Sequence, residues 1–212
     1  MNMKTLWINF VLFALIAPGA GGPLTAQPVV VSPQGPVRTL AGAIALAEPG
    51  GHILVKPGVY YESDILVDKP LTITGEGYPV FDARAEEGKE ILIIAADGVT
   101  VQGLTLRNVA KSYLKDLAAL RVRRHDRFVI RDNRLEDTFF GIYLEKASEG
   151  VVAGNHIQGK AVDEASSGNA IHAWYCERLL VENNTVRGHR DGIYFEFVNE
   201  SEVHGNRSEG NI

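Results

Sequence analysis

The sequence is poor in sulfur, in positive charge and in long apolar runs. A single cysteine among 212 residues excludes a disulfide-stabilised scaffold and a Cys-x-x-Cys motif for metal or redox chemistry. The formal net charge of −5 excludes a general binder of polyanions such as nucleic acids. No apolar run reaches the ~20 residues that a membrane-spanning helix needs. What is present is an apolar fraction of 45%, which is enough to build a folded core.

The first 26 residues have the pattern of an export signal. Lys4 is the only charged residue among the first 37, and the apolar run Leu6–Ala17 follows it. A stretch rich in glycine and proline then leads to Ala26, which suits a cleavage site. We therefore expect residues 1–26 to be a signal peptide. Residues 27–212 should form one exported domain without a membrane span.

Two short patterns recur along the chain at regular spacing. The first is apolar-x-x-Asn-x-apolar, with a decayed last copy and a first copy in which leucine takes the place of asparagine; its slots are Leu104, Asn133, Asn155, Asn184 and Asn206. Successive slots are 29, 22, 29 and 22 residues apart. The second pattern resembles Gly-Ile-Tyr, and its apolar slots are Leu120, Ile142, Ile171 and Ile193. Each of these is followed by the next asparagine slot after 13 residues.

These spacings indicate a unit of about 22 residues, with seven additional residues in every other copy. Such a unit, with short alternating strands and Asn/Gly turns, predicts a right-handed parallel β-helix. Asn133, Asn155 and Asn184 should stack at one turn, because asparagine tolerates the left-handed conformation and stacked amides can pair between coils. The additional residues, 109–117 and 160–169, should protrude from one corner two coils apart.

The start of the exported domain has the pattern of a cap followed by the first coils. Helical spacing over 37–47, ended by Pro49-Gly50-Gly51, predicts an amphipathic helix that closes the open end of the core. Segments bounded by glycine and proline predict the first strands, at 52–60, 65–67, 71–74, 80–81 and 91–95. The last coil has no cap, so we expect either that the chain is incomplete there or that a partner covers this end.

Alternation along the strands of the second pattern places one set of side chains on the outside, next to the long loops. This set includes Arg121 and Arg123. A column of exposed aromatic and charged residues beside a loop rim predicts a binding face. We expect that face to consist of Tyr143, Glu145, His172, Trp174, Tyr194 and Glu196. The alternative is ordinary cross-strand packing with a surface ion pair between Arg123 and Glu145.

The candidate metal ligands are His172, Cys176 and His189, because thiolate and imidazole groups suit Cu(I). On a straight strand His172 and Cys176 would face one side but lie ~13 Å apart. The alternative is a buried thiol with histidines that bind no metal. Carboxylates for sugar chemistry are present, but no tight motif marks a catalytic pair, and no catalytic residue is assigned.

Two stretches are similar to known families. The segment Thr39-Leu-Ala-Gly-Ala-Ile-Ala-Leu-Ala, followed by Gly50-Gly-His-Ile-Leu-Val-Lys-Pro-Gly-Val-Tyr60, resembles the N-terminal cap of pectin-lyase-like β-helices and specifies the fold alone. The segment Gly168-Asn-Ala-Ile-His-Ala-Trp-Tyr-Cys176, followed by Val186-Arg-Gly-His-Arg-Asp-Gly-Ile-Tyr-Phe-Glu-Phe197, resembles the NosD family of periplasmic proteins that mature nitrous oxide reductase. The second likeness covers nearly all of the exported domain, and the family continues with further coils.

The resemblance to the NosD family implies a binding protein rather than an enzyme. It implies a periplasmic location, partners in a membrane ABC transporter and in nitrous oxide reductase, and a link to copper or sulfur supply for the copper centre of that enzyme. It carries over no motif-defined metal ligands. The alternative function is a carbohydrate-binding or carbohydrate-active β-helix, such as a lyase, epimerase or hydrolase. That alternative requires acids clustered in one groove, or aspartate with a basic residue, and fold alone does not decide between the two.

Overall fold

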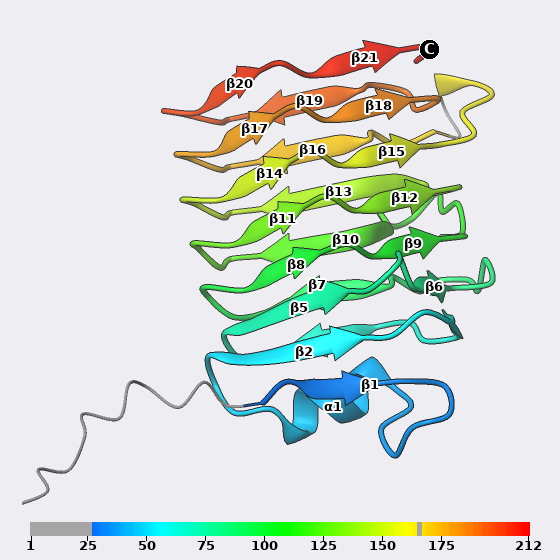
Figure 1. Cartoon of the computed structure of the whole chain (residues 1–212). Coiled ribbons are helices and arrows are strands. Elements are labelled where there is room, and N and C mark those ends of the chain that lie inside the picture. Colours follow the sequence, from blue (N-terminus) through cyan, green and yellow to red (C-terminus); the bar gives the residue numbers. More distant parts are fainter. Residues whose placement is uncertain (1–26, 165–166) are drawn as a thin grey trace, which may run out of the picture.

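The computed structural model describes residues 27–164 and 167–212, in which the chain winds into successive coils of short strands (Figure 1). Every ladder between described strands is parallel and joins one coil to another, so three sheets run along the axis. We name them A, B and C in the order in which each coil enters them. The predicted parallel β-helix is confirmed, whereas the predicted signal peptide, 1–26, lies outside the described residues.

The strands of each sheet are short. Sheet A consists of β1 (Val29–Val31), β2 (Gly51–Val55), β5 (Leu71–Gly75), β8 (Thr100–Gln102), β11 (Val129–Arg131), β14 (Val151–Ala153), β17 (Leu180–Glu182) and β20 (Glu202–His204). Sheet B consists of β3 (Val59–Tyr60), β6 (Val80–Asp82), β9 (Thr105–Arg107), β12 (Arg134–Glu136), β15 (His156–Gln158), β18 (Thr185–Arg187) and β21 (Arg207–Glu209). Sheet C consists of β4 (Ile65–Val67), β7 (Leu92–Ile94), β10 (Ala118–Arg123), β13 (Phe140–Glu145), β16 (Ile171–Trp174) and β19 (Ile193–Glu196).

The core is a set of apolar columns, one residue per strand. In sheet A, for example, Val101, Ile130, Val152 and Val181 occupy equivalent register positions and are fully buried. Each such side chain contributes about 1.5–3 kcal/mol when it is removed from water. Because every column runs through consecutive coils, the repeat in the sequence becomes one continuous hydrophobic interior.

The helix α1 (Leu40–Leu46) closes the N-terminal end of this interior, below β1 and β2 in Figure 1. Its N-cap is Thr39, whose Oγ1 accepts a hydrogen bond from the backbone N–H of Gly42 at 3.1 Å. The buried face of the helix packs against β1, β2 and β4. The capping role predicted from the sequence is confirmed. The helix is shorter than the predicted 37–47 because Thr39 and Ala47 both have extended backbones.

The asparagine slots form a ladder inside the turn between sheets A and B. Asn133, Asn155 and Asn184 are fully buried. The Nδ2 of Asn133 donates to Oδ1 of Asn155 at 3.1 Å, and the same bond joins Asn155 to Asn184 at 3.0 Å. Asn184 continues the ladder to Asn206 at 2.9 Å. The predicted stacking and amide pairing are confirmed.

The expectation that the ladder asparagines themselves adopt the left-handed conformation is wrong by one residue. The left-handed backbone belongs to the residue before each ladder asparagine: φ is 54° at Asp132, 64° at Gly154 and 54° at Asn183. These are residue types that tolerate positive φ at low cost. The ladder asparagines are instead placed by hydrogen bonding, since each side chain satisfies buried backbone groups of its neighbours.

The two long loops leave the solenoid at one corner. Residues 109–117 connect β9 to β10, and residues 160–169, whose members 165 and 166 are not described, lie between β15 and β16. Both connections therefore run from sheet B to sheet C, at the right of Figure 1. The coil between them passes the corner in the short step from β12 to β13. The predicted two-coil period is confirmed.

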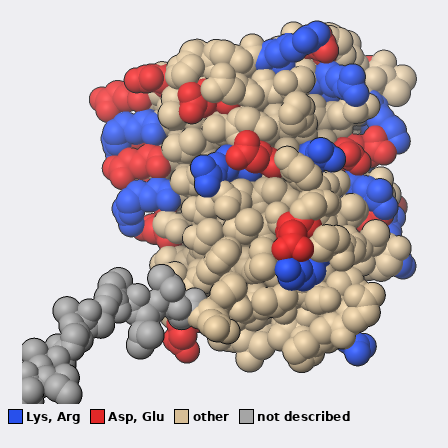
Figure 2. Space-filling model, in the orientation of Figure 1, with Lys and Arg blue, Asp and Glu red and all other residues tan. Residues whose placement is uncertain are grey.

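Charged side chains of both signs alternate along the opposite corner, where the chain passes from sheet C to sheet A (Figure 2). There Arg178 pairs with Glu177 at 2.6 Å and lies within ion-pair distance of Glu149 and Glu200. These are exposed pairs, which contribute at most about 1 kcal/mol each. None of the helices in the described part of the chain is long and apolar enough to cross a membrane.

Candidate functional site: a groove over sheet C

The outer face of sheet C holds two rows of polar and aromatic side chains in register. The first row is Arg121, Tyr143, His172 and Tyr194, and the second is Arg123, Glu145, Trp174 and Glu196. Their inward neighbours Leu120, Ile142 and Ile171 are fully buried in the core. The inward and outward assignment made from the sequence is therefore correct.

A groove of about 710 Å³ lies over this face, and a second hollow of about 330 Å³ opens beside it. Asp116, His172 and Glu196 line both spaces. Residues 114–117 of the first long loop form one wall. All six residues predicted to form the binding face line one space or the other: Tyr143, Glu145, His172, Trp174, Tyr194 and Glu196.

The expectation that this face is fully open to solvent is wrong for part of it. Tyr143 and His172 are each only 8% exposed, whereas Tyr194 is 37% exposed. The reason is ring contact between coils: the rings of Tyr143 and His172 lie parallel with centroids 4.5 Å apart, and the Tyr194 ring lies against His172 at a tilt of 38°, with centroids 5.1 Å apart. The edge of Phe140 contacts both buried rings. Trp174, Glu145 and Glu196 remain partly exposed.

Arg121 fixes one end of the groove. Its guanidinium lies 4.3 Å above the Tyr143 ring, and its Nε donates to Oε1 of Glu90 at 2.7 Å. It also donates to the backbone carbonyl of Asp116, which ties the long loop to the sheet. Glu90 accepts a further bond from the backbone N–H of Ala118 at 3.0 Å. Arg121 and Glu90 are both buried, and each compensates the charge of the other.

His172 is held as a neutral imidazole. Burial is the main cause that lowers its pKa from the ordinary 6.5 to about 4. Asn169 Nδ2 lies 2.9 Å from His172 Nδ1. With that amide nitrogen as the donor, Nδ1 accepts, and the neutral ring has its proton on Nε2. Nε2 is buried, and no partner for it exists in the described part of the chain.

The carboxylates around the groove affect the pKa of Tyr143. Burial, followed by the charge of Asp116, raises its pKa to about 12, and Glu145 and Glu196 act in the same direction. Arg121 opposes them. The phenol therefore stays protonated at every physiological pH, and the groove around it is acidic in character.

Aromatic side chains extend from the groove to the corner between sheets C and A. The ring of Tyr175 contacts Trp174 edge-on at 4.9 Å and stacks on Phe197 at 4.5 Å. Tyr175 is 51% exposed and Phe197 is 60% exposed. Lys146 lies over the Trp174 ring at 5.0 Å. This exposed pair gives the groove an apolar extension, which the sequence analysis did not include.

The predicted metal set His172, Cys176 and His189 is not brought together. Cys176 is buried, its Sγ lies 3.5 Å from the Leu144 carbonyl oxygen, and burial raises the pKa of its thiol. His189 lies at a different corner, where its Nε2 is 3.3 Å from Thr138 Oγ1. Within 27–164 and 167–212 no three His, Cys, Asp or Glu residues are grouped to hold a metal ion. The three predicted ligands therefore do not form one metal site among the described residues.

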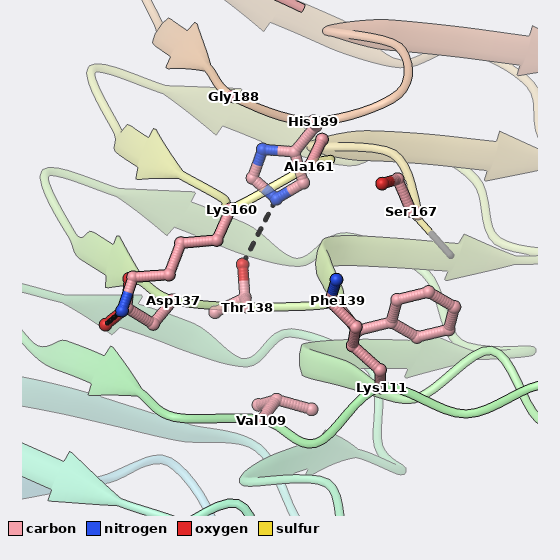
Figure 3. Close-up of a pocket in the computed structure, with 11 residues that line it drawn as sticks. Val109, Lys111, Asp137, Thr138, Phe139, Lys160, Ala161, Ser167, Gly188 and His189 are labelled. Atoms are coloured by element: carbon pink, nitrogen blue, oxygen red, sulfur yellow. Dashed lines mark hydrogen bonds and ion pairs between the residues drawn. The ribbon is translucent and has the colours of Figure 1, made fainter. Parts of the chain in front are cut away.

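His189 instead belongs to a small pocket of about 100 Å³ between the two long loops (Figure 3). Its Nδ1 lies 3.1 Å from the backbone oxygen of Arg187, so both ring nitrogens have partners. In Figure 3, Lys160 reaches Asp137 at the rim, with a distance of 2.6 Å between Nζ and Oδ2. Burial lowers the pKa of His189 to about 4, so this imidazole is also neutral.

Sequence reasoning missed Asp116 and Ser167 on the two long loops, and it missed Glu90 and Arg190 on the segments that lead into β7 and β19. The signal that could have identified them is the seven-residue insertion itself, which pointed to a loop rim but not to particular side chains. The conformation of the long loops is not encoded in the repeat, because the seven additional residues of each loop have no equivalents in the neighbouring coils.

Comparison with solved structures places the fold among pectin-lyase-like β-helices. The pectin methylesterase PemA from Erwinia chrysanthemi matches with a TM-score of 0.55 and 23% identity, over 75% of this chain and 54% of that one. The Escherichia coli protein YbhC matches with a TM-score of 0.53 and 16% identity, over 92% of this chain and 72% of that one. At these identities the likeness extends to the fold alone.

Comparison of the sequence defines the family. The family model described as "Periplasmic copper-binding protein (NosD)" matches residues 70–212, so the chain belongs to the NosD family. A protein from Pseudomonas aeruginosa strain PAO1 named "Probable ABC transporter binding protein NosD" is 31% identical over 134 residues. A protein of the same name from Stutzerimonas stutzeri is 31% identical over 138 residues. These matches cover 62% and 64% of this chain but only 31% of each relative.

Proposed function

We propose that this chain is an exported binding protein that works with an ABC transporter in the maturation of nitrous oxide reductase. Its part in that process is to dock proteins rather than to catalyse a reaction. Two observations support the proposal: membership of a family described as periplasmic, and relatives whose printed name is that of an ABC transporter binding protein. The observation that carries it is the groove over sheet C, which combines partly exposed aromatics with a loop wall.

Copper or sulfur supply enters this proposal through the assembly rather than through a metal site in the described residues. The family description supports a link to copper. His172, Cys176 and His189 do not fit the ion together, because they lie at different places in the fold and the thiol is held protonated by burial. The chain would then position the transporter and the reductase, between which copper or sulfur passes.

The test is the loss of docking when the exposed aromatics of the groove are removed. Trp174→Ala with Tyr194→Ala should weaken binding to purified transporter subunits or to nitrous oxide reductase by about 30-fold or more, because truncating a central aromatic anchor costs about 2 kcal/mol or more. The matched control removes two exposed tyrosines elsewhere, Tyr61→Ala with Tyr78→Ala. A groove variant that melts like the wild type and still binds and supports maturation fully would contradict the proposal.

A carbohydrate-binding role is the second candidate, and the stacked exposed rings of Tyr175 and Phe197 next to Trp174 favour it. Aromatic faces are apolar surfaces on which a sugar ring could lie. Titration of neutral and acidic oligosaccharides against the chain, followed by the indole N–H resonance of Trp174, tests this role. Saturable shifts that disappear in Tyr175→Ala would support it, and unchanged spectra would exclude it for those sugars.

A further inference from the structure

We propose that the groove over sheet C binds an extended segment of a partner protein and takes one of its arginine or lysine side chains between Asp116 and Glu196. This inference rests on the proposed docking function and specifies the chemistry of the docked segment. It uses charge, unsatisfied hydrogen-bonding groups and the shape of the rim.

The charge of the groove is the first observation. Five carboxylates and three basic side chains line the 710 Å³ space. Two of the bases are already engaged, because Arg121 pairs with Glu90 and Arg123 pairs with Glu145 at 3.2 Å, and the third, Lys115, is exposed on the loop wall. Asp64 is likewise paired, with Lys89. The structure gives no ion pair or hydrogen bond to the carboxylates of Asp116 and Glu196 among the described residues, and both line the groove and the adjoining hollow.

The second observation is independent of charge and concerns unsatisfied polar atoms. His172, of which 92% is buried because 8% is exposed, lines both spaces, and its Nε2 has no partner among the described residues. Ser167 lines the adjoining hollow, is 6% exposed, and its Oγ is also unpartnered within the described chain. Buried polar atoms that lack a partner are costly to the folded chain, and a ligand that supplies the partner relieves that cost.

Together these groups require two kinds of chemistry in one ligand. With Asn169 Nδ2 donating to Nδ1, the Nε2–H of His172 needs a hydrogen-bond acceptor, whereas Asp116 and Glu196 favour a cation. A glycan supplies acceptors without a cation, and a free polyamine supplies a cation without acceptors. A polypeptide with a basic side chain supplies both, since its backbone carbonyls accept and its guanidinium or ammonium group pairs with the carboxylates. The cation can also lie against the aromatic faces of Trp174 or Tyr194.

The rim fits a protein rather than a small solute. Tyr113 and Leu114, at the tip of the first long loop, line the hollow and the groove respectively, and they are 82% and 95% exposed. Tyr175 and Phe197 expose apolar rings at the far corner of the same sheet. Apolar anchors around a polar, acidic floor are the arrangement expected where a protein surface is covered by another.

The first arm of the test uses defined peptides and the full chain. A capped Gly-Gly-Arg-Gly-Gly peptide is titrated while the indole N–H resonance of Trp174 is followed, with Trp174→Phe to assign it. The isosteric citrulline peptide, which lacks the charge, should bind at least about tenfold more weakly. Asp116→Asn with Glu196→Gln should weaken binding of the arginine peptide by the same factor. Glu136→Gln with Glu202→Gln, which removes two exposed carboxylates from sheets B and A, should leave it unchanged.

Equal affinity for the arginine and citrulline peptides, or no binding of either, would overturn the inference. So would binding of the arginine peptide to the Asp116→Asn, Glu196→Gln variant as strongly as to the wild type. A neutral oligosaccharide that binds at the same resonance more tightly than the arginine peptide would assign the groove to a sugar instead. Melting temperatures of all variants show whether they remain folded.

The second arm separates this inference from the proposed function. Wild type and both double variants are tested for binding to purified transporter subunits and to the reductase. If the wild type binds and only the Asp116→Asn, Glu196→Gln variant fails, both statements are supported. If all three bind equally, the docking function stands and the inference is wrong. If none binds while the peptide arm shows charge-dependent binding, the inference stands and the named partners are wrong.

Discussion

Removing one asparagine from the ladder should lower the free energy of unfolding far more in the middle of the ladder than at its end. The Oδ1 of Asn155 is the acceptor for both the backbone N–H and the side-chain N–H of Asn133, at 3.0 and 3.1 Å. Its Nδ2 donates to the Ile130 carbonyl at 2.9 Å and to Asn184. Asn155→Ala therefore leaves two N–H groups of Asn133 without an acceptor in a fully buried site.

The magnitude follows from the cost of burying unpaired donors. Each N–H group left without an acceptor costs about 1–3 kcal/mol, so Asn155→Ala should lower the free energy of unfolding by about 2–6 kcal/mol. Asn206→Ala is the matched control, because Asn206 accepts the same two bonds from Asn184 but is partly exposed. Water can replace those bonds, so we expect a loss of about 1 kcal/mol there.

Urea denaturation followed by far-ultraviolet circular dichroism measures both variants. Coils of a solenoid can unfold separately, so coincidence of the dichroism transition with Trp174 fluorescence should be verified before a single free energy is assigned. Equal losses for Asn155→Ala and Asn206→Ala would refute the reasoning, because it depends on the burial of the orphaned groups. A smaller loss of unfolding free energy for Asn155→Ala than for Asn206→Ala would contradict it outright.

Two further predictions concern charge in buried places. Arg121→Ala should destabilise the protein by about 3–5 kcal/mol in chemical denaturation, because it leaves Glu90 buried without its partner, whereas Arg123→Ala, at an exposed pair, should cost at most about 1 kcal/mol. Burial lowers the pKa of His189 in the folded chain to about 4, so the unfolded chain binds the proton first as the pH falls. The stability of the protein should therefore fall as the pH is lowered from about 6.5 towards 4. His189→Gln should remove up to about 3 kcal/mol of this pH dependence, which is measured as the melting temperature against pH.

The sequence predicted the solenoid because its evidence is periodic. Spacings of 22 and 29 residues placed Asn133, Asn155 and Asn184 in one column, and the structure pairs their amides. The reasoning failed on the finer point of backbone conformation. Asparagine both tolerates left-handed φ and forms amide ladders, so the residue type alone could not show that the left-handed position belongs to Asp132 and its equivalents.

The candidate site was predicted in part, because strand alternation is also a regular pattern in the sequence. Strand alternation correctly placed Tyr143, His172 and Tyr194 on the outer face. Their burial depends on two things that alternation does not contain: the stacking of rings from different coils, and a loop with no counterpart in the repeat. The candidate metal set was chosen by residue type, and residue type does not show position: His172 lies on β16, whereas Cys176 and His189 lie beyond β16 and β18 at different corners of the solenoid.

The stacking of strands in sheet C also determines which side chains could change if the groove were to bind a different partner. Each register position on sheet C repeats at the strand spacing of ~4.8 Å, so a segment lying along the axis meets one outward side chain per coil. The inward residues of the same strands, such as Ile142 and Ile171, are fully buried in the core and do not line the groove. Side chains at the outward positions can therefore be exchanged with little effect on the fold where they are exposed, as at Tyr194. Exchange at the buried His172 disturbs the stack on both sides, so partner specificity should vary at the exposed Tyr194 end of the groove and stay fixed at its centre.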